Sequence, residues 1–246
     1  MAVRTSAATQ FYKRTTNLPA IARFSVCGWS RIEVDPNRST GFIALGPTSG
    51  FVFYEMGTGA DGTVFSTYNG SVSVDGTQLT VGAWNFVALV CDGTGAGNLR
   101  GYKNGVLDSN NAGNGSVTSG EINIATGNDA NTADFLNGQS ANWMIFDKLI
   151  MTPGMLKKQQ TSWEPLPEFR PFLNGWYPLL SVNDVRDYSG HGNHLAKQGS
   201  PVSELRAPVE SYVRGYRRKI WLPTGNIAAA AATIFSPRLL LTGVGV

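Results

Sequence analysis

The sequence predicts an all-β protein, and three observations lead to this prediction. The chain of 246 residues contains 29 glycines, 42% hydrophobic residues and only 15% charged residues, a profile typical of short strands joined by glycine-containing turns. Residues 84–107 read as strand, turn and strand: apolar residues fill 84–91, Asp92-Gly93 supplies turn chemistry, and Asn104-Gly105 reverses the chain again. Apolar segments recur between Gly, Pro and Asn residues along most of the chain. The length allows a buried core, and the hydrophobic content excludes disorder.

Further strands are expected in succession after residue 20. The expected ranges are 24–34, 42–45, 50–56, 62–68, 71–74, 84–91, 99–102, 121–125 and 143–150. Near the N-terminus, the aromatic pair Phe11-Tyr12 predicts an edge strand. Asp75-Gly76 is expected to turn the chain after 71–74, and residues 109–120 and 126–134 are expected to be polar loops.

One short helix is expected after the last of these strands. Thr152 fits the N-cap position and Pro153 fits the first helical position. Residues 155–163 supply a short apolar stripe, and Pro165 ends the helix.

Several segments together resemble the laminin G-like or concanavalin A-like jelly-roll family. The central segment has a Trp, an apolar strand, an Asp-Gly turn and a Tyr-x-Asn-Gly motif, and two flanking segments fit the same pattern. The matching residues are Trp84, Val87–Val90, Asp92-Gly93, Tyr102, Asn104-Gly105, Val106, Phe24–Trp29, Phe135–Gly138 and Trp143–Phe146. The resemblance spans roughly residues 10–160. It implies an antiparallel jelly-roll β-sandwich with one short helix, which we assign to residues 1–164.

Residues 165–246 form a C-terminal extension in this interpretation. Three prolines within 165–171 predict an extended linker, and a short strand is expected at 176–179. The polar loop Asp187–His194 resembles an Asp-x-Ser-Gly-x-Gly-Asn segment that recurs beside such jelly-rolls. The extension is too short for a second jelly-roll. We therefore expect it to pack on the sandwich, to dock on a partner, or both.

A docking role is expected for the basic and aromatic segment 206–221. Arg and Tyr are enriched at protein interfaces, and the apolar tail 234–241 needs either a partner or its own sandwich to cover it. The segment carries too little charge for a nucleic-acid arm. The candidate docking residues are Arg206, Arg214, Tyr216, Arg217, Arg218, Lys219 and Trp221.

The sequence argues against an enzyme. Jelly-roll glucanases of the resembling superfamily need carboxylates at every second strand position, in a Glu-x-Asp-x-Glu pattern. Glu33-Val-Asp35 approaches this pattern, but Pro36 ends the strand before a third carboxylate, so we interpret the pair as a polar strand end. His191 and His194 share one loop, but a structural zinc site needs four ligands. A hydrogen-bonded polar loop is their expected role, and no catalytic residue is predicted.

The loops and strands contain candidate residues for binding calcium and glycans. No cofactor is expected, but related jelly-rolls often bind calcium through rim loops, so calcium is an alternative. The aspartates in loops of this kind are Asp61, Asp92, Asp129 and Asp134. For glycan binding, the aromatic candidates are Tyr54, Tyr68 and Trp143, with burial in the core as the competing role. Cys27 and Cys91 lie in apolar strands and are expected to be buried thiols, with a disulfide between them as the alternative.

Composition also limits where the protein acts. The first ten residues lack the apolar core of a signal peptide, and no apolar run is long enough to span a membrane. The net charge of +3 is too small to argue for nucleic-acid binding. No membrane or nucleic-acid partner is therefore expected.

The order of sandwich, polar loop, Arg206–Val209 segment and apolar tail is similar to structural proteins of tailed bacteriophages. This resemblance implies a non-enzymatic virion component, a head decoration or fibre protein, made in the host cytoplasm. Its lectin-like sandwich would face outward, towards cell-surface glycans. Its protein partners would be other virion proteins such as the major capsid protein, in a homo-oligomer or an array on the particle. A carbohydrate-binding adhesion module is the alternative, and an inactive or divergent glucanase is the third hypothesis.

Overall fold

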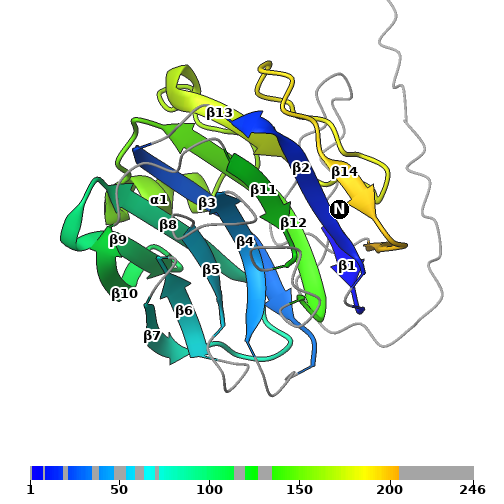
Figure 1. Cartoon of the computed structure of the whole chain (residues 1–246), viewed down its shortest axis with the longest axis horizontal. Helices are drawn as coiled ribbons and strands as arrows, with labels where there is room; N and C mark the ends of the chain where they lie inside the picture. The colour runs from blue at the N-terminus through cyan, green and yellow to red at the C-terminus, as the bar shows by residue number, and fades with distance from the viewer. Residues whose placement is uncertain are drawn as a thin grey trace, which may run out of the picture.

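Two antiparallel sheets form the body of the protein in the computed structural model (Figure 1). The structure describes residues 2–7, 9–18, 22–34, 39–46, 54–58, 64–69, 72–113, 120–126 and 135–204. The eight-stranded sheet contains β1 (Ala2–Thr5), β3 (Arg23–Ile32), β8 (Asn85–Asp92), β9 (Gly95–Lys103), β10 (Val106–Gly113), β12 (Gly138–Asp147), β13 (Leu173–Tyr177) and β15 (Val202–Glu204). The seven-stranded sheet contains β2 (Phe11–Leu18), β4 (Thr40–Gly46), β5 (Tyr54–Thr58), β6 (Val64–Tyr68), β7 (Ser73–Gln78), β11 (Gly120–Ile124) and β14 (Ala196–Gln198).

The strand order confirms the expected all-β jelly-roll sandwich. The first sheet runs β10-β9-β8-β3-β12-β1-β15, with β13 paired to β12 as well, and the second runs β14-β2-β11-β4-β5-β6-β7. The strand pairs formed by the described residues are antiparallel, including the central pairs β3–β8 and β3–β12. The chain crosses repeatedly between the two sheets, as in a jelly roll.

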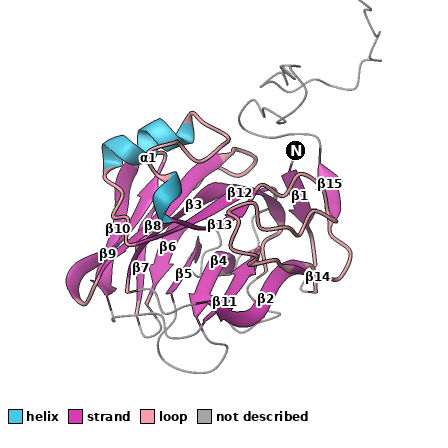
Figure 2. Cartoon of the chain, turned by 90° about the horizontal axis from the view of Figure 1, so that it is seen from above, coloured by secondary structure: helices cyan, strands magenta, loops and turns pink. Residues whose placement is uncertain are grey.

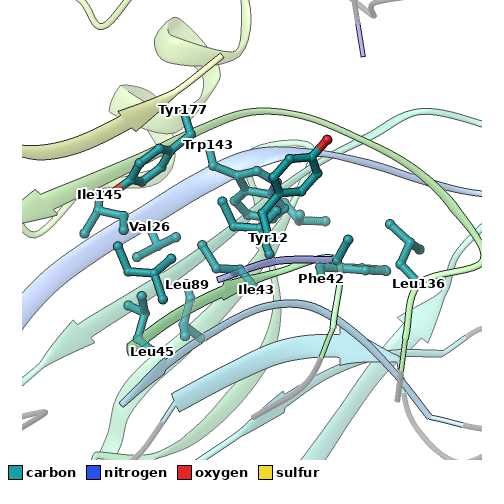
Figure 3. Packing of buried hydrophobic residues seen from close by; sticks show 14 of the residues in the cluster. Tyr12, Val26, Phe42, Ile43, Leu45, Leu89, Leu136, Trp143, Ile145 and Tyr177 are labelled. Atoms are coloured by element: carbon teal, nitrogen blue, oxygen red, sulfur yellow. The ribbon is translucent and has the colours of Figure 1, made fainter. Parts of the chain in front are cut away.

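The main hydrophobic core lies between the two sheets (Figure 3). Trp143, Tyr12 and Tyr177 are among its largest buried side chains. The Trp143 ring occupies the place of a side chain at Gly28, where an added Cβ would lie 2.4 Å from ring atoms. Burial raises the pKa of the hydroxyls of Tyr12 and Tyr177 well above the usual value. Each hydroxyl donates to a backbone carbonyl, so its burial is compensated.

A second hydrophobic cluster covers the outer face of the eight-stranded sheet. It is built by the helix α1 (Pro153–Gln160), the 3-10 turn η2 (Arg170–Phe172) and the segments around them (Figure 2). Leu156 and Trp163 pack there against sheet residues such as Phe146. Because both faces of β8 and of the second half of β12 are buried, residues 86–91 and 143–146 read as continuous apolar runs instead of alternating ones.

The helix and the central hairpin are confirmed at the residues that predicted them. Thr152 caps α1, because its Oγ1 accepts a hydrogen bond from Met155 N (3.3 Å). Asn104 (φ 52°) and Gly105 (φ 73°) adopt the left-handed conformations that a tight hairpin requires. None of the helices among the described residues is long and apolar enough to cross a membrane.

The two cysteines are buried free thiols, as predicted. Cys91 belongs to the core between the sheets, whereas Cys27 belongs to the cluster on the outer face. Their side chains therefore lie on opposite faces of one sheet, which excludes the alternative of a disulfide. Burial strongly raises the pKa of the Cys27 thiol.

Four expectations for local structure are wrong. Asp75-Gly76 does not turn the chain but lies within β7. Gly76 is needed there because Asp108 of β10 occupies its side-chain position: an added Cβ would lie 2.3 Å from the Asp108 carboxylate. The Asp108 carboxylate also accepts from Thr77 N (2.9 Å) and Thr77 Oγ1 (2.5 Å), which closes this side of the sandwich.

The second error concerns residues 109–113, which belong to strand β10 and not to a loop. The side chains of Ser109 and Asn111 face inward, whereas Asn110 is exposed. Asn111 Nδ2 donates to Val72 O (2.8 Å), and the hydroxyls of Ser109 and Thr67 lie 3.0 Å apart. Third, β2 is not an edge strand, because β14 pairs with it on the side away from β11. Fourth, residues 165–171 are not an extended linker: a turn at 167–169 leads into η2, and Phe169 packs in the outer cluster.

Residues 165–204 add strands to both sheets. Strand β13 pairs with β12 and β15 pairs with β1 in one sheet, while β14 pairs with β2 in the other. Figure 1 shows β14 beside β2, at the end of the molecule where the N-terminal strands lie. Residues 205–246 lie outside the described part of the chain.

Candidate functional site

The polar loop Asp187–His194 is organised around one buried carboxylate, that of Asp187. Oδ1 accepts from Trp176 N (3.0 Å) and Ser189 N (2.9 Å), and Oδ2 accepts from Ser189 Oγ (2.8 Å) and Asn193 N (2.9 Å). The Asn193 carbonyl in turn accepts from Tyr177 Oη of β13 (2.8 Å). The Asp, Ser and Asn of this motif therefore hold the loop on the sandwich, and we call this arrangement the Asp187 clasp.

The two histidines lie in a hydrogen-bonded polar loop, as predicted, and both are exposed. Nδ1 of His194 accepts from Asp187 N (3.1 Å), which leaves that nitrogen occupied. His191 is exposed and donates its backbone N–H to Ser189 Oγ (3.3 Å). In the described ranges no three His, Cys, Asp or Glu residues gather in a way that could hold a metal ion.

Of the aspartates considered for calcium, only Asp92 lies among the described residues. It forms ion pairs with Arg23 (2.7 Å) and Arg100 (3.8 Å), so two cationic side chains already surround it. Asp61, Asp129 and Asp134 lie outside the described residues. Calcium binding stays a prediction.

The aromatic candidates for stacking on a sugar have different settings. Trp143 is fully buried in the core and donates its Nε1–H to Ser140 Oγ (2.6 Å), which excludes stacking. Tyr68 is half-buried in β6. Tyr54 belongs to β5, but its side chain is not described.

A polar cluster lies on the outer face of the eight-stranded sheet, and the sequence alone did not reveal it. Strand register places Arg4 of β1 beside Gln139 of β12, and Gln139 beside Arg31 of β3. On these strands Ala2, Ala141 and Trp29 belong to the outer cluster, while Val3 and Ile32 belong to the core between the sheets. Because side chains alternate along a strand, Arg4, Gln139 and Arg31 all face outward. With Trp29 and Glu33 they form what we call the Arg31 cluster.

Glu33 holds two members of the cluster together. Its Oε2 lies 2.7 Å from Arg4 Nε, and its Oε1 accepts from Gln139 Nε2 (2.5 Å). The Arg4 side chain is 42% exposed, whereas that of Glu33 is 16% exposed. The cluster therefore reaches the surface at Arg4 and is anchored below it by Glu33.

Three polar atoms of the cluster are buried and find no hydrogen-bond partner in the part of the chain that the structure describes. They are Arg31 Nε, Gln139 Oε1 and Trp29 Nε1. Gln139 is 3% exposed and Trp29 is 7% exposed. More than about 90% of buried polar groups in folded proteins have a partner. Three unpaired atoms in one cluster therefore mark the place on this face where polar groups lack hydrogen bonds, and all three atoms are shielded from solvent.

Glu33 is the residue that a glucanase would need, and its setting is that of a structural anchor. Both carboxylate oxygens already contact Arg4 or Gln139. Asp35, the second carboxylate of the sequence motif, lies outside the described residues. A carboxylate held this way can position neighbouring side chains, whereas glycoside hydrolysis requires one that meets substrate.

The candidate docking residues give no further site. All of them, from Arg206 to Trp221, lie outside the described residues. Their docking role stays a prediction.

With this geometry in place, comparison with known proteins decides the family. Residues 5–152, more than half of the chain, match the model of the concanavalin A-like lectin/glucanases superfamily. The chain belongs to this superfamily. The match confirms the resemblance seen in the sequence, and the chain therefore has a lectin-like fold. No curated protein matches it in sequence.

Several solved structures are similar to this chain at low sequence identity. A proposed carbohydrate binding protein from Bacteroides ovatus is similar with a TM-score of 0.56 and 14% identity, over 82% of this chain and 61% of that one. The CBM40 of a Ruminococcus gnavus sialidase, bound to α2,3-sialyllactose, has a TM-score of 0.49 and 10% identity, over 64% and 95%. A heptameric pentraxin from Limulus polyphemus has a TM-score of 0.48 and 15% identity, over 60% and 74%.

Proposed function

We propose that the protein is a non-enzymatic, lectin-like binding protein that recognises carbohydrate through the Arg31 cluster. The observation that carries this proposal is the set of three unpartnered polar atoms at Arg31, Gln139 and Trp29. Sugars present hydroxyl groups that both donate and accept hydrogen bonds. One sugar can therefore satisfy the amide oxygen and the two N–H groups once their side chains turn towards it, since all three atoms are shielded from solvent in the free protein. Membership of a superfamily of lectins and glucanases supports the same ligand class.

Binding fits the cluster better than hydrolysis does. Hydrolysis of a glycosidic bond needs two carboxylates that flank the bond, one as acid and one as base or nucleophile. Glu33 is committed to Arg4 and Gln139. The glucanase hypothesis predicts turnover of a glucan that is lost in Glu33→Gln, so turnover by the wild type would contradict our proposal.

The test is a glycan array probed with the full chain, followed by titration of the best glycan. We expect Arg31→Ala to weaken binding at least about tenfold, since loss of one charge-assisted hydrogen bond exceeds about 1.4 kcal/mol. Arg23→Ala is the matched control: Arg23 lies on the same strand, eight positions away, and pairs with Asp92. If both variants bind as tightly as the wild type, the site is placed wrongly. If no glycan binds, the function is wrong.

A role in a bacteriophage virion is a second proposal, supported by the sequence of the C-terminal segment. Basic and aromatic residues are interspersed in 206–221, and an apolar tail follows. The last described strand, β15, is an edge strand of the eight-stranded sheet. Residues 206–246 would continue from there to a major capsid protein or another virion protein. The sandwich would then present the Arg31 cluster to host glycans.

This second proposal is tested by assembly and not by sugar binding. The full chain and a variant lacking residues 206–246 are mixed with phage particles and separated by sedimentation. We expect the full chain to sediment with particles, alone or as a homo-oligomer, and the truncated chain to remain behind while still binding glycan. Equal behaviour of the two chains would contradict a docking arm.

A further inference from the structure

We propose that the sugar recognised by the Arg31 cluster is acidic, and that its carboxylate binds the Arg31 guanidinium. This inference rests on the proposed glycan-binding function and adds the chemical class of the ligand. The class follows from the pairing of arginines, from the balance of donors and acceptors, and from charge.

Arg31 has no ion pair among the described residues, in contrast to five other arginines. Those five each form an ion pair with a carboxylate; they are Arg4, Arg23, Arg100, Arg170 and Arg186. Arg31 is half-buried, yet within the described ranges it has no such partner, and its Nε is fully shielded from solvent. A shielded cationic group is costly unless an anion accompanies it. Arg31 therefore favours a ligand that brings a negative charge.

The unpartnered atoms require more acceptors than donors from the ligand. Arg31 Nε and Trp29 Nε1 are donors, and Gln139 Oε1 is an acceptor. A carboxylate provides only acceptors, and its two oxygens match the planar fork of a guanidinium. A sugar hydroxyl beside it can donate to Gln139 Oε1. Once the three side chains open to the ligand, a sugar acid therefore matches all three atoms. A neutral sugar leaves the charge of Arg31 uncompensated.

The charges of the cluster point in the same direction. The two guanidinium groups outnumber the single carboxylate of Glu33, and that carboxylate lies on Arg4 at 2.7 Å. Arg31 and Gln139 occupy paired positions on neighbouring strands, which are about 4.8 Å apart. Adjacent substituents of one sugar ring can therefore contact both side chains.

The experiment compares an acid with its own uncharged derivative on the full chain. The probes are methyl glucuronide, its methyl ester and methyl glucoside, each titrated at low and high salt. We expect the acid to bind at least about tenfold more tightly than the ester, with an advantage that shrinks as salt rises. Arg31→Gln should abolish that advantage, Arg31→Lys should keep part of it, and Arg23→Gln should keep all of it.

The possible failures are distinguishable. If the ester and the glucoside bind as tightly as the acid, the acidic class is wrong and the glycan-binding function stands. If none of the sugars binds, on an array or in titration, both proposals are overturned. If Arg31→Gln does not fold, Arg31→Lys, which retains the charge, is the deciding variant. If its preference for the acid equals that of the wild type and does not shrink at high salt, the carboxylate does not bind Arg31 and the assignment is overturned.

Discussion

Removal of the Asp187 carboxylate should destabilise the protein more than any surface charge does. The carboxylate accepts four hydrogen bonds, from Trp176 N, Ser189 N, Ser189 Oγ and Asn193 N. Asn193 is buried, so water cannot replace its bond, whereas the half-buried Ser189 can be rehydrated. Trp176 is half-buried like Ser189, so its N–H can also be rehydrated. The one uncompensated bond to a charged acceptor gives about 2 kcal/mol for Asp187→Ala.

Urea unfolding measures this loss directly. With a slope of about 2.5 kcal/mol per molar urea, the midpoint should fall by about 0.8 M. Asp187→Asn keeps the volume but turns an N–H₂ group towards existing donors, so we expect an intermediate loss. Asp92→Ala is the control, because Asp92 is a more exposed carboxylate with cationic partners and should contribute less than about 1 kcal/mol. If Asp187→Ala shifts the midpoint no more than Asp92→Ala, the Asp187 clasp is not structural.

Three further predictions concern stability. Asn123→Leu should raise the melting temperature, because both amide atoms of this fully buried side chain lack a hydrogen-bond partner in the described structure and cost about 1–3 kcal/mol; a lower melting temperature would contradict this. Gly28→Ala should cost about 1–3 kcal/mol through a clash with the neighbouring indole, whereas Gly154→Ala in the open first turn of α1 should be neutral or stabilising by calorimetry. The stabilisation that comes from the buried hydroxyls of Tyr12 and Tyr177 should be fully present below about pH 10 and be lost above it, because the unfolded chain then releases tyrosine protons that the folded chain retains. A free energy of unfolding that stays constant above about pH 10 would refute this.

The sequence correctly predicted the elements whose formation depends on residues close together in the chain. The strand around 84–91, the hairpin at Asn104-Gly105 and the helix capped by Thr152 all appear where side-chain chemistry placed them. Asp75-Gly76 failed because a glycine that turns a chain and a glycine that admits a neighbouring carboxylate look identical in sequence.

The polar segment 109–113 failed for a related reason. Polar residues usually mark loops, but here Ser109 and Asn111 find partners on the opposite sheet and are buried in a strand. Those partners, Thr67 and Val72, lie about forty residues earlier in the chain. Only the tertiary arrangement shows that the polarity is satisfied.

The candidate site was beyond reach of the sequence because register creates it. Arg4, Arg31 and Gln139 become neighbours only when β1, β3 and β12 pair in one particular alignment. The sequence did draw attention to Glu33, but as a candidate for catalysis, and the structure uses it to anchor Arg4 and Gln139. The sequence offered only a weak indication of this site. In the mostly apolar strand around Trp29-Ser30-Arg31, the charged Arg31 lies two positions after an aromatic residue and so on the same face of the strand.

The most direct test of the glycan-binding account is a crystal structure of the full chain grown with an acidic sugar that it binds. We predict that the sugar lies on the outer face of the eight-stranded sheet, with its carboxylate within hydrogen-bonding distance of Arg31 and a hydroxyl on Gln139 Oε1. A sugar bound instead on the seven-stranded sheet or in the loops, with Arg31 and Gln139 untouched, would contradict the account.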